Sequence, residues 1–224
     1  MSEFRHEWKH VISASDSITI RQRMSVVART DPHAVDGRYR IRSLYFDNLY
    51  DKALREKIDG VNRREKFRLR FYNDDTDLIH LEKKSKINGL CAKESTRILK
   101  SQVEDLLNGE LGWMPLTGDP LITQLYAKML YQGLRPRTIV DYTRQPFIYG
   151  PGNVRVTIDD HIRTGILCTD FLDMDCVTVP APDAGIILEV KWDEFLPDPI
   201  RAAVGLDNRR VTAFSKYAAC RVYG

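Results

Sequence analysis

Cationic side chains recur at every second position of residues 62–72, Asn-Arg-Arg-Glu-Lys-Phe-Arg-Leu-Arg-Phe-Tyr. In a β-strand alternate side chains point to opposite faces, so one face would carry a cationic row and the other would be mostly apolar. The cationic face holds Arg64, Lys66, Arg68, Arg70 and Tyr72. Salt screens exposed like charges, so a solvated outer face is one reading of this row. Complementarity to a polyanion is the other reading.

Several further stretches show the same alternation and extend the cationic surface. The polar faces of these strands carry Arg40, Lys84, Lys93, Tyr142, Arg144 and Arg155, and Arg40 is a candidate phosphate-binding residue. Arg40 belongs to a second strand in which Arg38, Arg40 and Arg42 alternate with Tyr39 and Ile41. Arginine keeps its charge when it is desolvated and can fork onto two phosphate oxygens. The strands together therefore favour a phosphate-binding surface over a solvated face of mixed sign.

One carboxylate stands on the polar face of the predicted strand 185–192. Glu189 lies in Ile-Ile-Leu-Glu-Val-Lys-Trp and alternates with Lys191. A salt bridge with Lys191 or a nearby arginine is one interpretation. The other is a ligand for Mg²⁺ or Mn²⁺, since phosphoryl-transfer sites often hold the metal with one or two carboxylates and the substrate phosphates. Glu7 and Glu82 are weaker candidates of the same kind.

The order of elements predicts an α+β fold built on an antiparallel sheet. Strands are expected at 4–12, 38–47, 62–72, 77–87, 90–99, 135–149, 153–162 and 185–192. Asn88-Gly89 is a hairpin signal, so residues 61–99 should form a three-stranded meander. About eight hairpin-linked strands suggest a closing barrel. Helices at 101–108, 120–132 and 208–220 have apolar stripes that could cover its outer face, which leaves a cationic tunnel inside.

Composition limits the remaining possibilities. The chain has 224 residues and a net charge of +3, so it is not a globally basic nucleic-acid coat, and one domain over 1–224 is expected. Residues 61–100 hold eleven Lys or Arg against six Asp or Glu, so the excess is local. Desolvated cations in such number would require bound anions. Nucleic-acid-binding sheets interleave aromatics with basic residues, whereas Phe67 and Phe71 fall opposite the cationic row, so nucleic acid is not expected.

The chain shows no targeting or membrane signal. It has no apolar run of 18 residues and no apolar signal-peptide core near the start, so a cytoplasmic protein is expected, with any membrane link made through a partner protein. The four cysteines, Cys91, Cys168, Cys176 and Cys220, lack zinc-finger spacing and are interpreted as buried, reduced thiols.

Short motifs across nearly the whole chain resemble the VTC domain, the polyphosphate polymerase domain of the CYTH-like triphosphate tunnel enzymes. They are Arg-His-Glu-Trp-Lys at 5–9, Ile-Arg-Ser-Leu-Tyr-Phe-Asp-Asn at 41–48, Arg-Glu-Lys-Phe-Arg-Leu-Arg at 64–70, Leu-Glu-Lys-Lys at 81–84, Ala-Lys-Glu-Ser at 92–95, Asp-Tyr-Thr-Arg at 141–144, Arg-Val-Thr-Ile-Asp at 155–159, Leu-Glu-Val-Lys at 188–191 and Phe-Ser-Lys-Tyr at 214–217. The resemblance implies an antiparallel tunnel barrel that transfers the ATP γ-phosphate to a polyphosphate end, with Mn²⁺ or Mg²⁺.

The resemblance also implies roles for individual residues. Triphosphate and the growing chain would be bound by Lys9, Lys66, Arg68, Arg70, Lys84, Lys93, Arg144 and Arg155. Tyr142 would support the phosphate site, Glu189 would hold the metal, and Ser215 and Lys216 would close one end of the tunnel. The residues expected to act in catalysis are Lys9, Arg68, Arg70, Glu189 and Lys216. Phosphoryl transfer needs positioning and charge neutralisation more than a covalent nucleophile, which fits these residue types.

Two positions depart from the family pattern and keep other functions open. Arg5 stands where the wider tunnel family often has an acidic residue. This difference favours a site that binds phosphate over one in which several carboxylates hold a metal cluster. Ala213 stands where eukaryotic polymerases tend to have a further lysine. The alternatives are a tunnel-fold triphosphatase, an adenylate-cyclase-like enzyme, or a non-catalytic module that binds polyphosphate or phosphate.

Overall fold

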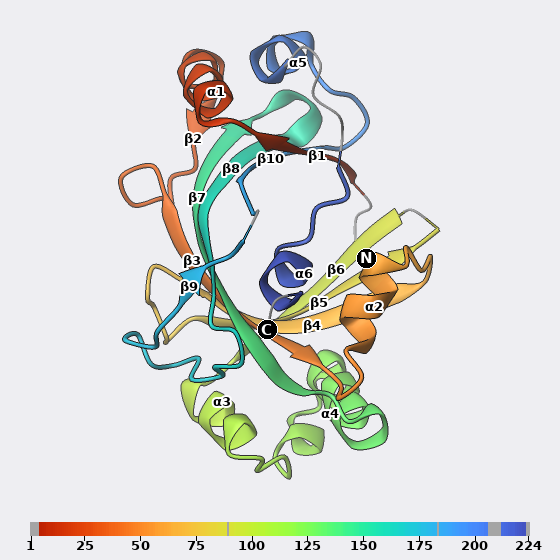
Figure 1. Cartoon of the computed structure of the whole chain (residues 1–224). Coiled ribbons are helices and arrows are strands. Elements are labelled where there is room, and N and C mark those ends of the chain that lie inside the picture. The colour runs from red at the N-terminus through yellow and green to blue at the C-terminus, as the bar shows by residue number, and fades with distance from the viewer. Residues whose placement is uncertain (1–4, 89, 183, 206–211, 223–224) are drawn as a thin grey trace.

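The computed structural model describes residues 5–88, 90–182, 184–205 and 212–222, and one curled antiparallel sheet dominates it (Figure 1). The strands are β1 (His6–Ile12), β2 (Arg29–Thr30), β3 (Tyr39–Asp47), β4 (Arg64–Tyr72), β5 (Ile79–Ile87), β6 (Leu90–Ile98), β7 (Arg135–Tyr149), β8 (Val154–Thr164), β9 (Val179–Pro180) and β10 (Ile186–Trp192). The main path runs β1-β10-β8-β7-β3-β4-β5-β6, with β2 on β7 and β9 on β8. The expected antiparallel tunnel architecture is confirmed, as is the 61–99 meander.

Within the described residues, six α-helices accompany the sheet: α1 (Ala14–Val27), α2 (Lys52–Ile58), α3 (Lys100–Leu107), α4 (Pro120–Gln132), α5 (Asp198–Val204) and α6 (Lys216–Arg221). Local sequence explains where they start and end. Ser13 caps α1 in a capping box with Asp16. Asp119 accepts from the backbone of Leu121 and Ile122, and Gly133 ends α4 in the left-handed conformation. No helix in the described part of the chain is long and apolar enough to cross a membrane.

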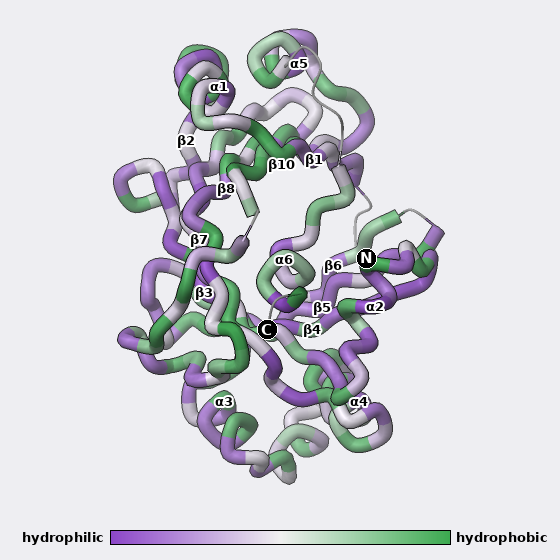
Figure 2. The backbone as a smooth tube through the Cα atoms, in the orientation of Figure 1, coloured by the Kyte–Doolittle hydropathy of each residue, from purple (hydrophilic) through white to green (hydrophobic). Residues whose placement is uncertain are grey.

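The convex face of the sheet carries two apolar clusters under helices. Phe67, Leu69 and Phe71 of β4 pack in one cluster with side chains from α3 and α4. The other cluster joins β7, β8 and β10 to α1 and α5, with Val156 and Leu188 at its centre. Figure 1 shows these two helix pairs at opposite ends of the sheet, and Figure 2 shows that their apolar residues alternate with hydrophilic ones along the chain. The apolar face of residues 62–72 therefore points outward and its cationic face inward, as predicted.

The C-terminal helix α6 does not cover the convex face, contrary to the expectation for 208–220. Residues 206–211 lie outside the described residues, and α6 lies inside the curl of the sheet (Figure 1). Tyr217 is buried there against Tyr45, with ring centroids 5.0 Å apart, and its hydroxyl donates to Asp47 at 2.6 Å. Arg221 forms two hydrogen bonds of 3.1 Å to Asp51 next to α2. These contacts hold the start of α6, with Ser215 and Lys216, at the concave face.

Candidate functional site

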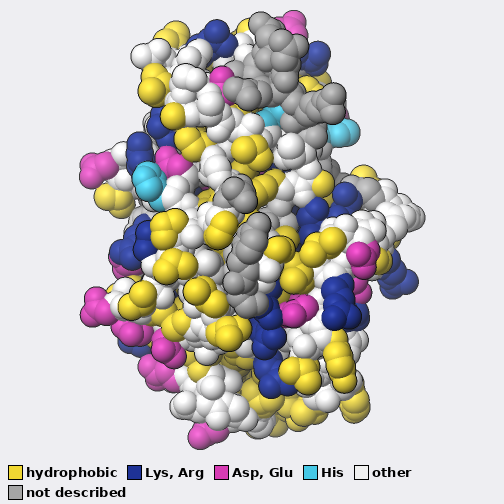
Figure 3. Space-filling model, in the orientation of Figure 1, with side chains coloured by type: hydrophobic (Ala, Val, Ile, Leu, Met, Phe, Trp, Pro, Cys, Tyr) yellow, Lys and Arg dark blue, Asp and Glu magenta, His cyan; other side chains and the backbone are white. Residues whose placement is uncertain are grey.

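The concave face encloses a cavity of about 310 Å³ lined by cationic side chains from strands that lie far apart in sequence. Eleven lysines and arginines line it: Arg5, Lys9, Lys66, Arg68, Arg70, Lys84, Lys93, Arg144, Arg155, Lys191 and Lys216. A second cavity of about 540 Å³ adjoins it and shares Lys9, Lys66 and Lys84 with it. Figure 3 shows one outer face of the molecule, on which Lys and Arg side chains are mixed with acidic and hydrophobic ones. The predicted cationic interior is therefore present.

One wall of the cavity is organised by a buried carboxylate on β5. The Glu82 side chain is 3% exposed and pairs with Arg68 at 2.5 Å and Lys93 at 2.5 Å, with Arg70 at 3.7 Å. Burial acts to raise the pKa of Glu82, but Arg68, Arg70 and Lys93 together lower it far below its usual range. Arg70 also donates to Ser43 at 3.0 Å and to the Tyr142 hydroxyl at 2.9 Å. These bonds fix the arginines so that they point into the cavity.

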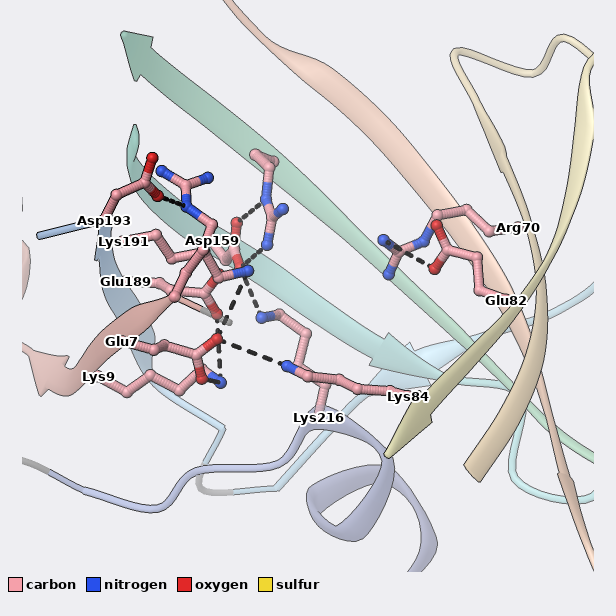
Figure 4. Close-up of polar contacts among 12 residues, drawn as sticks. Glu7, Lys9, Arg70, Glu82, Lys84, Asp159, Glu189, Lys191, Asp193 and Lys216 are labelled. Atoms are coloured by element: carbon pink, nitrogen blue, oxygen red, sulfur yellow. Dashed lines mark hydrogen bonds and ion pairs between the residues drawn. The ribbon is translucent and has the colours of Figure 1, made fainter. Parts of the chain in front are cut away.

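A second wall, on β1 and β10, holds two carboxylates that share the same lysines. Glu189 pairs with Lys191 at 2.8 Å and with Lys9 at 3.3 Å, and Lys9 also pairs with Glu7. Lys84, which extends from β5, lies 3.5 Å from Glu7 and joins the two ends of the sheet. Burial and the Glu189 charge act to raise the pKa of Glu7, but the three lysines lower it to about 2. Figure 4 shows this cluster apart from the Arg70–Glu82 pair on the other wall.

A third carboxylate, on β8, positions cations at the start of α6. Asp159 is fully buried and accepts from Arg144 at 2.7 and 2.8 Å and from Lys216 at 2.5 Å. Lys216 also lies over the Tyr142 ring, 4.6 Å from its centroid. Burial acts to raise the pKa of Asp159, but Arg144 and Lys216 lower it. Three carboxylate centres thus hold most of the cations in place; Glu7 and Glu189 line the cavity, whereas Glu82 and Asp159 lie behind its lining.

All predicted site residues except one line this cavity. Lys9, Lys66, Arg68, Arg70, Lys84, Lys93, Tyr142, Arg144, Arg155, Glu189, Ser215 and Lys216 are brought together. Arg40 is the exception: its side chain is 55% exposed and pairs with Asp74 at 2.9 Å. The prediction assigned the wrong face of β3 to the interior, because it followed the arginines. Tyr39, Ile41 and Tyr45 face inward, while Arg40 lies at the surface and Arg42 is buried against Asp141.

Sequence reasoning missed several residues of the cavity. Tyr45 lines it, and its hydroxyl accepts from Arg68 at 2.8 Å. Burial acts to raise the pKa of Tyr45, but Arg68, Lys66 and Arg70 lower it to about 7. Lys191 and Asp159 were also unassigned, although each shares a strand face with a predicted residue two or four positions away. The cationic rows also did not reveal that four acidic side chains on strands, Glu7, Glu82, Asp159 and Glu189, pair with the cations of the cavity.

Among the described cations that line the cavity, Lys66 has the weakest contacts to offset its positive charge. Among the described residues, its ammonium group has a polar contact with Ser215 at 3.4 Å and lies over the Tyr45 ring. Burial lowers the pKa of Lys66 to about 7, opposed by Tyr45 and reinforced by Lys84, Arg68 and Lys9. Burial and Lys9 likewise lower the pKa of Lys84 to about 8, although Glu7 acts to raise it. An incoming polyanion would favour the charged form of both lysines.

We therefore expect polyphosphate affinity to fall as pH rises from 7 to 9. Both lysines lose their proton in the free protein over this range, so polyphosphate binding must be accompanied by proton uptake. For each lysine, this uptake lowers the affinity by up to about tenfold per pH unit. Titration calorimetry with long-chain polyphosphate, in buffers of different ionisation enthalpy, would measure this uptake. Lys66→Met should reduce the number of protons taken up near pH 7. Equal affinity at pH 7 and 9 would show that these lysines do not contact the ligand.

The donor set fits a divalent cation that arrives with phosphate groups. In the described part of the chain no group of three or more His, Cys, Asp or Glu side chains is arranged to hold a metal. Mg²⁺ at phosphoryl-transfer sites commonly uses one or two carboxylates plus phosphate oxygens and water. Glu189 and Glu7 supply two such carboxylates, and both converge on Lys9 and Lys191. The salt-bridge interpretation of Glu189 is confirmed, and its role as a metal ligand stays a prediction.

Comparisons with solved structures place this architecture among known folds. A protein from Pyrococcus horikoshii OT3 superposes with a TM-score of 0.51 at 12% identity, covering 97% of this chain and 99% of that one. A conserved hypothetical protein from Pyrococcus furiosus also has a TM-score of 0.51 at 12% identity, covering 96% and 99%. A Bacillus halodurans protein described as a candidate adenylate cyclase has a TM-score of 0.50 at 11% identity, covering 85% and 81%. At these identities the likeness concerns the fold alone.

The sequence itself identifies the family. None of the curated proteins matches the chain at a significant level. The family model of the VTC domain matches residues 4–223, which span the whole sheet and the described part of α6. The motifs that suggested this resemblance supply the cations and carboxylates of the cavity. The chain therefore belongs to the VTC domain family and has its tunnel fold.

Proposed function

We propose that this protein is a polyphosphate polymerase that uses ATP and a divalent cation. The observation that carries the proposal is the convergence of eleven lysines and arginines in one cavity of about 310 Å³. Membership in the VTC domain family supports the same substrate class. The chemistry is that of a phosphoryl transfer: an oxygen of the polyphosphate end bonds to the γ-phosphorus, the bond to the β-phosphate oxygen breaks, and ADP leaves.

The three walls would divide the work of this reaction. Arg68 and Arg70 present rigid guanidinium groups that suit the equatorial phosphate oxygens, where charge is spread in the transition state. Lys9 and Lys216 approach from the other walls and would neutralise the attacking and leaving oxygens. Glu189, with help from Glu7, would hold a divalent cation, which would add to the neutralisation of phosphate charge. Since the nucleophile belongs to the substrate, no activated side chain is required.

Replacement of Arg70 by Ala should weaken polyphosphate binding by about 10- to 100-fold, the loss expected for hydrogen bonds to a charged group. Arg40→Ala is the matched control, since it removes an arginine that lies at the surface and pairs with Asp74. Polyphosphate titration of both folded variants, compared with wild type, gives the measurement. Equal affinity of the Arg70 variant and wild type would mean that the cationic row of β4 does not contact the ligand.

Product analysis tests the proposed reaction itself. Purified protein incubated with ATP and Mn²⁺ should produce polyphosphate chains and release one ADP for each phosphate added to a chain. Release of orthophosphate without chains would assign a triphosphatase, and tight polyphosphate binding without ATP turnover would assign a binding module.

A further inference from the structure

The segment between β8 and β9 brings two thiols into contact outside the cavity. The Sγ atoms of Cys168 and Cys176 lie 2.8 Å apart, although the residues are eight positions apart in sequence. Both side chains are half-buried rather than enclosed, which corrects the expectation of fully buried thiols. Cys91 lines the cavity and Cys220 is buried in α6, so those two thiols lie in other parts of the fold. The contact between Cys168 and Cys176 is therefore a local property of this segment.

The backbone around the two thiols is held by turns and by a buried ring. The Cys168 N–H donates to Gly165 at 2.8 Å, and the Cys176 N–H donates to Asp173 at 3.3 Å. Between the cysteines, Phe171 is fully buried against Phe71 of β4, with ring centroids 4.9 Å apart. The two thiols thus approach each other where the segment leaves and rejoins the sheet. Bond formation between them would require little movement of the anchored chain.

A buried ion pair ties the same segment to β3 and β7. Arg42 is 4% exposed, pairs with Asp141 at 2.9 Å and donates to the backbone carbonyl of Asp173. Without the Asp173 carbonyl, one guanidinium nitrogen of Arg42 would be buried without this hydrogen bond, which would destabilise the fold. The segment therefore covers both the apolar cluster at Phe71 and the Arg42–Asp141 pair. Phe71 and Asp141 are next in sequence to the cavity residues Arg70 and Tyr142, so the segment packs on the sheet behind this wall of the cavity.

We propose that Cys168 and Cys176 form a reversible thiol–disulfide modification site that clamps residues 168–176 onto the convex face of the sheet. The oxidant is a low-molecular-weight disulfide such as oxidised glutathione. The Cys168 thiolate attacks one glutathione sulfur, the glutathione S–S bond breaks, and one glutathione thiolate leaves. The Cys176 sulfur then attacks Cys168, loses its proton and displaces the second glutathione. Two electrons pass from the cysteine pair to glutathione, and a dithiol reverses the reaction.

The order of these two steps follows from the surroundings of Cys176. Burial, followed by its hydrogen bond with Cys168, raises the pKa of Cys176 to about 12. Its thiol therefore stays protonated at neutral pH and suits the resolving step better than the first attack. Asp170 accepts from the Cys168 thiol at 3.6 Å and adds a negative charge near the pair. Both features favour the protonated Cys176 thiol, so the resolving step should be slow, since the thiolate is the reactive form.

The crosslink should stabilise the fold and leave the cavity's own residues unaltered. A disulfide that closes a short loop restricts the unfolded chain, and the expected rise in the unfolding midpoint is about 5–10 °C for a chain of this size. This rise in the unfolding midpoint does not depend on any reaction in the cavity. Disulfide formation between Cys168 and Cys176 therefore does not depend on the proposed polymerase activity.

The experiment uses the full chain, reduced and then incubated with oxidised glutathione. Thiol counting after denaturation should show the loss of two of the four thiols, and peptide mapping should find residues 168 and 176 joined within one chain. Cys168→Ser and Cys176→Ser should each abolish this intramolecular crosslink, whereas Cys91→Ser should retain it. The oxidised wild type should unfold at a higher temperature, and a dithiol should restore the original midpoint.

Other products would overturn the proposal. A stable glutathione adduct on either thiol, or a crosslink from either thiol to Cys91 or to a second chain, would show that the pair does not close. A Cys168–Cys176 crosslink that leaves the unfolding midpoint unchanged or lowers it would contradict the clamp.

Discussion

Glu189→Gln should lower kcat for ATP turnover by at least about 100-fold while polyphosphate still binds. The amide keeps the size of the side chain but removes the charge that pairs with Lys9 and Lys191 and that would hold a divalent cation. Loss of one group that stabilises transition-state charge typically costs about 10²–10³ in rate. Binding should persist because the other cations of the cavity keep their own carboxylate partners. Steady-state kinetics over a range of Mn²⁺ concentrations, with polyphosphate titration alongside, would measure both effects.

Glu194→Gln is the matched control for this variant. The residue follows the same strand, is exposed, and lies outside the residues that line the cavity. It should leave kcat unchanged. If Glu189→Gln turns over ATP as fast as wild type, Glu189 serves only as a salt-bridge partner and the metal assignment is wrong.

Glu82→Gln should destabilise the ligand-free protein strongly and make its stability depend on bound polyanion. Glu82 is the shared partner of Arg68, Arg70 and Lys93, and its side chain is 3% exposed. Removing one partner from a buried ion cluster leaves uncompensated charge and costs about 3–5 kcal/mol. The unfolding midpoint should fall by roughly 10 °C. Polyphosphate binds the same cations, so it should raise the midpoint of this variant more than that of wild type.

Glu94→Gln provides the comparison on the neighbouring strand. Glu94 pairs with Lys83 at 2.9 Å, but its side chain is 49% exposed, so this pair is worth at most about 1 kcal/mol. Polyphosphate should stabilise this variant and wild type equally. If it raises the midpoint of Glu82→Gln no more than that of wild type, the three cations do not meet the ligand.

The sheet was largely predictable because its strands alternate with a clear period of two. In β4 the apolar Phe67, Leu69 and Phe71 fix the outward face, so the cations between them must point inward. Hairpin signals such as Asn88-Gly89 set the order of the meander, although residue 89 itself lies outside the described residues. Twelve of the thirteen proposed site residues lie in one cavity, but their roles came from the resemblance to the VTC domain, and no strand alternation could have placed Ser215 and Lys216 there.

The errors arose where charge and burial conflict. In β3 the arginines resemble a tunnel-facing row, yet Arg42 is buried on the convex side because Asp141 and the 165–178 segment satisfy it. A local pattern cannot reveal partners almost a hundred residues away. The buried carboxylates Glu82 and Asp159 were undervalued for a related reason, since Arg68 and Arg144 stand directly opposite them on neighbouring strands and this register is set only when the sheet forms. The inward position of α6 depends on Tyr217 meeting Asp47, which no periodicity encodes.

The most direct test of the proposed function is incubation of the purified protein with γ-labelled ATP and Mn²⁺, followed by separation of the products on a gel. We expect a ladder of labelled polyphosphate that an exopolyphosphatase degrades, with ADP formed in step. Ala213, where some family members have a lysine, would then be a tolerated difference. Label that appears only as orthophosphate, or that stays in ATP despite tight polyphosphate binding, would contradict the assignment as a polymerase.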